Sequence, residues 1–84
     1  MTPTVTLYGR PGCHLCDEAR GALERVQRRM PFEMIEHDIT LDDALHARYL
    51  VRIPVVFLDG DELFEYHVDE AALEARLRRP DGLG

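Results

Sequence analysis

Two cysteines separated by two residues, Cys13 and Cys16, are the side chains of this 84-residue chain whose type and spacing point most directly to chemistry. A thiolate is the species that attacks a disulfide or binds a metal, and a C-x-x-C pair is a common arrangement for thiol–disulfide exchange. A glycine- and proline-rich turn precedes the pair, and a helical pattern follows it. The sequence therefore places the dithiol at a predicted helix start.

A helix start favours the thiolate, because unpaired N–H groups and the macrodipole place positive charge there. If the pKa of Cys13 fell by ~2 from ~8.5, the thiolate fraction at pH 7 would rise roughly 25-fold, while lower nucleophilicity would cost about 8-fold. The larger gain is a better leaving group when Cys16 attacks a mixed disulfide. Cys16 lies deeper in the helix, so we assign Cys13 as nucleophile and Cys16 as resolving thiol. Arg10 adds positive potential near Cys13, and Asp17 opposes it.

A structural zinc site and a pair of inert core cysteines are the alternatives to redox chemistry. Zinc needs four ligands in a structural site. The chain has no second C-x-x-C, and its histidines outside the motif, His37, His46 and His67, are scattered. The pattern therefore favours redox chemistry and predicts no metal site.

The elements that must position the dithiol are predicted from hydrophobic periodicity and turn residues. Strands are expected over 4–8, 32–38, 55–58 and 62–68, and helices over 13–30, 41–50 and 70–79. Thr40 is predicted to cap the second helix, whose apolar face would be Leu41, Leu45 and Tyr49. Asp69 can cap the last helix. The continuously apolar third strand is expected to be central and the fourth to lie nearer an edge.

Length and composition indicate one domain, residues 1–84, with a frayed tail at 79–84. The net charge of −6 and a pI near 5 argue against a nucleic-acid binder. The sequence shows no long apolar run and no secretory signal, so no membrane association is expected. Two cysteines at this spacing do not form the framework of a secreted scaffold, so we expect a reducing cytoplasm.

The sequence resembles the glutaredoxins of the thioredoxin superfamily over residues 5–77, most closely the small bacterial glutaredoxin-like proteins with a divergent C-H-L-C site. The resemblance rests on L-Y-G-R-P-G-C-H-L-C and on the later R-I-P-V-V-F-L-D-G. It implies an α/β, thioredoxin-like β-α-β-α-β-β-α fold with a four-stranded mixed sheet and helices on both faces. It also implies a cis Pro54, which would turn the backbone of Ile53 toward Cys13, where an extended substrate could add β-type hydrogen bonds.

The family also implies glutathione as a co-substrate, bound with help from Arg10, three residues before the nucleophile, and from Asp69. The sequence departs from the family at Glu65-Tyr66, which replace a Gly-Gly pair, and at His14-Leu15, which replace Pro-Tyr. Two bulky residues, one anionic, would crowd and repel an anionic tripeptide. Two interpretations stay open for each of three residues. Arg10 could bind glutathione or be a solvated turn residue, and Asp69 could bind glutathione or be a simple helix cap. His14 could be a cation that stabilises the thiolate or an inert loop residue.

The sequence thus predicts a monomeric, cytoplasmic thiol–disulfide oxidoreductase without a bound cofactor. Its substrate would be a protein disulfide or a glutathione mixed disulfide, and its electron donor glutathione or a thioredoxin reductase. Two alternatives are a non-catalytic binding module of the same fold and a glutathione-dependent iron–sulfur cluster carrier.

Overall fold

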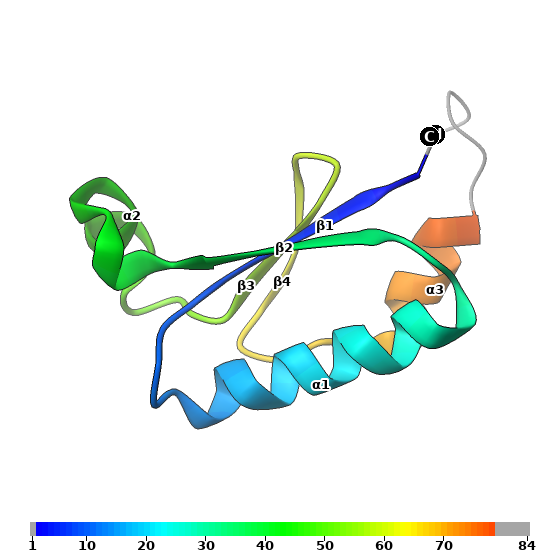
Figure 1. Ribbon diagram of the computed structural model, residues 1–84, viewed down its shortest axis with the longest axis horizontal. Helices are drawn as coiled ribbons and strands as arrows, with labels where there is room; N and C mark the ends of the chain where they lie inside the picture. The colour runs from blue at the N-terminus through cyan, green and yellow to red at the C-terminus, as the bar shows by residue number, and fades with distance from the viewer. Residues whose placement is uncertain (1, 79–84) are drawn as a thin grey trace.

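The computed structural model describes residues 2–78, with four strands and three α-helices in the predicted order (Figure 1). The strands are β1 (Thr4–Gly9), β2 (Glu33–Asp38), β3 (Val55–Leu58) and β4 (Asp61–Glu65). The helices are α1 (His14–Arg29), α2 (Asp43–Tyr49) and α3 (Glu70–Arg78), and a short 3-10 helix, η1 (Ile39–Leu41), precedes α2. The frayed tail predicted for 79–84 lies outside the described residues.

The four strands form one mixed sheet in the order β2-β1-β3-β4. β1 runs parallel to β2 and antiparallel to β3, and β3 runs antiparallel to β4. Asp59 and Gly60 join β3 to β4, both with positive φ, 49° and 91°, as the tight hairpin turn between twisted strands requires. The predicted mixed sheet, central third strand and edge fourth strand are confirmed.

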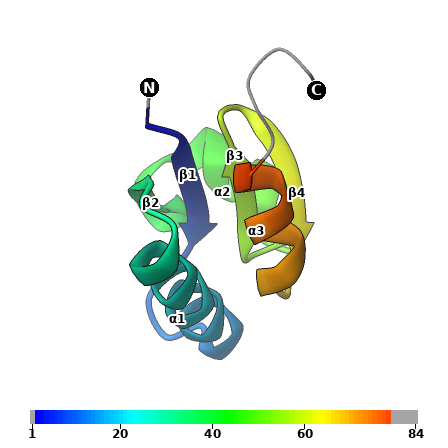
Figure 2. The same cartoon turned by 90° about the vertical axis from the view of Figure 1, so that its right-hand side faces the viewer.

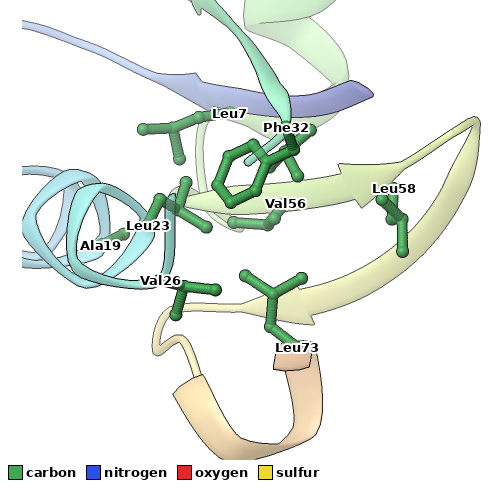
Figure 3. Close-up of a cluster of buried hydrophobic side chains, with 9 residues drawn as sticks. Leu7, Ala19, Leu23, Val26, Phe32, Val56, Leu58 and Leu73 are labelled. Atoms are coloured by element: carbon green, nitrogen blue, oxygen red, sulfur yellow. The ribbon is translucent and has the colours of Figure 1, made fainter. Parts of the chain in front are cut away.

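Helices cover both faces of the sheet, as predicted. Side chains alternate along β3, so that Val56 and Leu58 join one buried cluster while Val55 and Phe57 join or contact the other. Helices α1 and α3 lie on the first face (Figure 2), and α2 contributes Tyr49 to the cluster on the second. The first cluster, here the larger core, contains Val5, Leu7, Ala19, Leu23, Val26, Phe32, Val56, Leu58 and Leu73 (Figure 3).

The second cluster, here the smaller core, contains Cys16, Ile39, Tyr49, Ile53 and Val55. Tyr8, Cys13, Leu45 and Phe57 pack against it, and the Tyr8 ring stacks on Tyr49 with centroids 4.8 Å apart. The start of α1 and helix α2 lie toward the same end of the sheet (Figure 1). The two redox-motif cysteines are thus linked to the smaller core.

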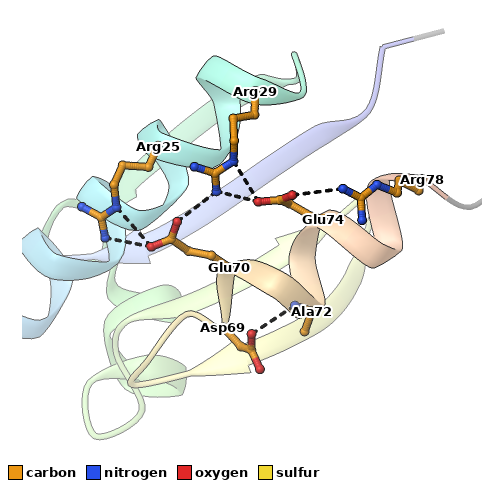
Figure 4. Close-up of polar contacts among 7 residues, drawn as sticks. All are labelled: Arg25, Arg29, Asp69, Glu70, Ala72, Glu74 and Arg78. Carbon is orange, nitrogen blue, oxygen red and sulfur yellow. Dashed lines mark hydrogen bonds and ion pairs between the residues drawn. The ribbon is translucent and has the colours of Figure 1, made fainter.

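Ion pairs tie α1 to α3 on the solvent side of the larger core (Figure 4). Arg25 donates to one oxygen of Glu70, and Arg29 bridges Glu70 and Glu74. The hydrogen bond from Arg25 lowers the pKa of the Glu70 carboxyl most, and the one from Arg29 lowers it further. Exposed pairs of this kind each stabilise a fold by about 0–1 kcal/mol, so they supplement the apolar contacts.

The predicted helix over 41–50 is wrong at its start. Asp38 caps η1 by accepting from the Thr40 N–H at 2.8 Å, and Asp42 caps α2 by accepting from the N–H groups of Ala44 and Leu45. Leu41 is 84% exposed rather than part of the apolar face. Aspartate is a stronger helix cap than threonine, and two aspartates in close succession divide the segment into two short helices.

The fourth strand ends three residues earlier than predicted, at Glu65. The reason is Tyr66, whose φ of 66° turns the chain out of the extended conformation.

Candidate active site

Cys13 is the N-cap of α1, with an extended backbone conformation (φ −93°, ψ 110°). Its Sγ accepts a hydrogen bond from the backbone N–H of Cys16 at 3.1 Å. The two cysteines are joined in a disulfide, with their Cα atoms 5.1 Å apart. A sulfur that accepts from a helix N-terminal amide is placed where a thiolate is stabilised, since the amide dipoles point toward it.

The two sulfur-bearing residues differ in access to solvent. Cys13 is half-buried, whereas Cys16 is 1% exposed and belongs to the smaller core. A dissolved disulfide can therefore approach Cys13 but not Cys16. Cys16 is placed to act on Cys13 from inside the protein.

Gly9, the last residue of β1, makes room for Cys16. A Cβ atom at Gly9 would lie 3.0 Å from the Sγ of Cys16 and 3.2 Å from its Cβ, which is tighter than most real Cβ contacts. The sequence suggested only a turn residue here. One sequence feature could have indicated this close contact. Gly9 continues a β-branched strand pattern four residues before Cys13, and a glycine in a strand often marks a close approach to the backbone.

Ile53 is linked to the dithiol through the smaller core, and Pro54 follows it in the chain. The side chain of Ile53 shares that core with Cys16, and Cys13 packs against it. The Ile53–Pro54 peptide bond is cis. The Ile53 N–H donates to the Tyr49 carbonyl at 3.0 Å, and the Pro54 carbonyl accepts from the Tyr66 N–H at 2.8 Å.

The segment that precedes Pro54 is fastened to β4 by side chains. Arg52 binds both Glu62 and Glu65, and its guanidinium lies 5.4 Å from the centroid of the Tyr49 ring. The hydrogen bond that Arg52 donates to Glu62 raises the pKa of its guanidinium most, and the one to Glu65 raises it further. The phenol of Tyr66 donates to the Val51 carbonyl at 2.7 Å. Glu65 and Tyr66, noted in the sequence as departures from the family pattern, thus hold this segment.

His14, between the cysteines, is open to solvent and pairs with Glu18. Its side chain is 85% exposed, and its Nε2 lies 2.6 Å from the Oε2 of Glu18. On the other side of the helix, Arg20 bridges Asp17 to Glu36 of β2. The hydrogen bonds that Arg20 donates to Glu36 and, to a smaller extent, to Asp17 raise the pKa of its guanidinium. The carboxylate of Asp17 is therefore partly neutralised by its partner.

Arg10 and Asp69 lie in different surroundings. Arg10 is exposed after β1, on a depression that it shares with Gly9, Pro11 and Arg20, and it forms no ion pair with the described part of the chain. Asp69 caps α3, where its carboxylate accepts from the Ala72 N–H at 3.0 Å (Figure 4). The structure thus gives Asp69 a capping contact and leaves the Arg10 guanidinium without a carboxylate partner among residues 2–78.

Across residues 2–78, no group of three or more histidine, cysteine, aspartate and glutamate side chains is arranged to hold a metal ion. The same residues include no helix of the length and apolarity needed to span a bilayer.

Comparison with known proteins places the chain in a family. Residues 4–78 match the glutaredoxin-like domain (DUF836). An uncharacterized protein of Mycobacterium tuberculosis is 34% identical over 82 residues, covering 92% of this chain and 84% of the relative. The solution structure of a Nitrosomonas europaea protein superposes with a TM-score of 0.78 at 32% identity, covering 90% of this chain and 92% of that one.

A thioredoxin of Halobacterium salinarum has the same fold, with a TM-score of 0.61 at 24% identity over 89% of this chain and 71% of that one. The fold, the matched residues and the Cys13–Cys16 pair agree, and the chain belongs to the glutaredoxin-like (DUF836) family of the thioredoxin superfamily.

Proposed function

We propose that this protein is a thiol–disulfide oxidoreductase that uses Cys13 as nucleophile and Cys16 as resolving thiol. The observation that carries the proposal is the placement of the two sulfurs. Cys13 is half-buried and its Sγ accepts from a helix N-terminal amide, while its bonded partner Cys16 is buried. This placement supplies an accessible, stabilised thiolate and an internal thiol within bonding distance.

The reaction proceeds by two exchanges. The Cys13 thiolate attacks one sulfur of a substrate disulfide, forming a Cys13–substrate disulfide and releasing the other substrate sulfur as a thiolate. Cys16 then loses its proton and attacks the Cys13 sulfur, which closes the internal disulfide and releases the second substrate thiolate. The substrate gains two electrons and the protein loses two. A thiol donor, glutathione or the dithiol of a thioredoxin reductase, restores the reduced protein by the reverse chemistry.

Substrate contacts are assigned to residues around Cys13. The backbone at Ile53–Pro54 would receive an extended substrate segment. Because the Ile53 N–H already donates to Tyr49, the added segment would bond there to the Ile53 carbonyl. Arg10 and His14 flank the nucleophile in sequence and would contact the substrate from the helix side. The protein would act as a monomer in a reducing cytoplasm, where the dithiol is kept available.

The test is a pair of cysteine variants. Cys13→Ser should abolish reduction of a disulfide substrate, since no accessible thiolate remains. Cys16→Ser should accumulate a mixed disulfide that mass spectrometry detects, because nothing resolves it. The chain has two cysteines, so each variant leaves one thiol and the assignment is unambiguous.

The same assay separates oxidoreductase activity from a non-catalytic binding module of this fold. An idle dithiol would show no reduction of insulin or of a peptide disulfide, and reduced Cys13 would not react with iodoacetamide at neutral pH. Either result in the correctly folded protein would overturn the proposal.

A further inference from the structure

A groove of about 320 Å³ runs between α1 and the connection from β4 to α3. Neither cysteine lines the groove, but Asp17 lies one helical turn from Cys13, and the N–H of Tyr66 donates to the Pro54 carbonyl. The groove therefore ends within one helical turn of the nucleophile. The charged and aromatic side chains that line it are Asp17, Glu18, Arg25, Tyr66, His67 and Glu70.

Negative charge predominates in this groove. Three carboxylates line it, and Arg25, the one arginine in its lining among the described residues, is already bound to Glu70 at 2.9 Å. The side chains of Asp17 and Glu18 are 62% and 55% exposed in their own ion pairs. Ion pairs so open to water are weak, and these carboxylates can therefore still attract a cation.

The N-terminus of α3, at the groove's far end, is unfavourable for binding an anion. The carboxylate of Asp69 accepts from the Ala72 N–H, and Glu70 adds a second acidic side chain in the first turn. A ligand carboxylate placed there would meet like charge where a helix start would otherwise attract it.

Tyr66 forms a wall of the groove and is held in an unusual conformation to do so. Its φ of 66° belongs to the left-handed region, which costs a bulky residue free energy and suits glycine. Two hydrogen bonds fix it there, from its N–H to the Pro54 carbonyl and from its phenol to the Val51 carbonyl. The phenol ring is thus fixed beside the segment that carries Pro54.

We propose that this site accepts a polypeptide disulfide with a basic residue near its cysteine and rejects glutathione and its mixed disulfides, which leaves the reductase dithiol as the electron donor of the two named above. The inference rests on the proposed thiol–disulfide exchange and names its substrate class. Glutathione has two carboxylates and one ammonium group, so it would bring net negative charge into an acidic groove narrowed by Tyr66. A basic flank would meet Asp17 and Glu18 with favourable charge. The exchange itself is the two-step reaction given above.

The first experiment compares three substrates built on one peptide: an Arg-flanked disulfide, a Glu-flanked disulfide and the glutathione mixed disulfide. We expect kcat/KM to favour the Arg-flanked substrate over the Glu-flanked one by ~10-fold at low salt, and the ratio to shrink as salt screens the charges. The glutathione mixed disulfide should be the poorest of the three.

The second experiment uses variants with matched controls. Tyr66→Gly removes the wall and suits the backbone, so the fold is retained; it should raise kcat/KM for the glutathione mixed disulfide by ~10-fold. Tyr66→Phe removes the phenol oxygen but keeps the wall, and the mixed disulfide should stay poor. Glu18→Gln should reduce the Arg-over-Glu preference about 2- to 3-fold. Glu24→Gln, the same charge change on α1 outside the groove lining, should not.

The results distinguish the two proposals. Equal rates for all three substrates, a glutathione mixed disulfide reduced fastest, or an unchanged kcat/KM for the glutathione mixed disulfide in Tyr66→Gly would overturn the assigned substrate class while leaving the oxidoreductase intact. Failure to reduce any of the three would instead overturn the exchange activity, and the substrate assignment with it. Trapping rates of Cys16→Ser with each substrate give the same order without turnover.

Discussion

Substituting Gly9 by alanine should strain the dithiol directly. The new Cβ would lie 3.0 Å from the Sγ of Cys16 and 3.2 Å from its Cβ. Contacts this close are tighter than most real Cβ contacts, so the end of β1 and the start of α1 would have to separate by a few tenths of an ångström. The Cys16 side chain cannot swing aside, because it is short, buried and bonded to Cys13.

Overpacking of this kind typically costs about 1–3 kcal/mol. For a domain of 84 residues, each 1 kcal/mol corresponds to a fall in Tm of about 4–8 °C. Gly21→Ala is the matched control, because its Cβ would lie 3.5 Å from an Arg25 nitrogen, an ordinary contact. Alanine within a helix is favoured over glycine by roughly 0.5–1 kcal/mol. Thermal and urea denaturation of the oxidised proteins should therefore move in opposite directions for the two variants.

The same substitution should slow the second exchange step. A displacement of about 1 Å between reacting groups can cost as much as 100-fold in rate, so a displacement of a few tenths of an ångström should make mixed disulfides of Gly9→Ala persist for about 3- to 10-fold longer. Their decay can be followed by quenched-flow mass spectrometry. An unchanged Tm together with an unchanged decay rate would refute the reasoning that Gly9 is there to admit the sulfur.

Three further predictions concern the surroundings of the site. Asp69→Ala should cost about 0.5–2 kcal/mol of stability through loss of the α3 cap while Asp69→Asn keeps most of it, as urea midpoints would show; equal losses would contradict a capping role. Tyr66→Phe should cost about 0.5–1.5 kcal/mol, because the Val51 carbonyl loses its donor; hydrogen exchange near that carbonyl should rise, and unaltered exchange would argue against the contact. The lowered pKa of Glu70 means that its ion pairs stabilise the fold at neutral pH and lose that effect as pH falls below the ordinary value of 4.5. Urea midpoints measured over this range should fall less steeply for Glu70→Gln, and parallel curves would exclude the effect.

Most of the fold could be predicted from the sequence, because the signals are local. Alternation and β-branched residues marked the strands, and the position of Pro31 marked the end of α1. The start of α2 was missed because three potential capping residues lie within five positions, and local preference does not decide among them. The early end of β4 was missed because nothing in the sequence pattern requires a tyrosine to adopt a positive φ.

The candidate site was predicted at the level of the two cysteines but not of their support. The C-x-x-C spacing and the helix start are local features, so the sequence located Cys13 and Cys16. The closeness of Gly9 to Cys16 depends on how β1 and α1 cross, which is a tertiary property. The same holds for Arg52, whose partners lie 10 and 13 residues further along the chain.

Helix α1 extends from one buried cluster to the other, with Cys16 in the smaller core and Ala19, Leu23 and Val26 in the larger one. Neither sulfur belongs to the larger core, so making or breaking the bond between them alters covalent linkage at only one end of the molecule. The molecule thus has one end that carries the disulfide and the smaller core, and another end, with the larger core, that the disulfide does not reach. We therefore expect that reduction of the disulfide changes packing around Ile53 and Tyr49 and leaves the larger core between the sheet and helices α1 and α3 as it is.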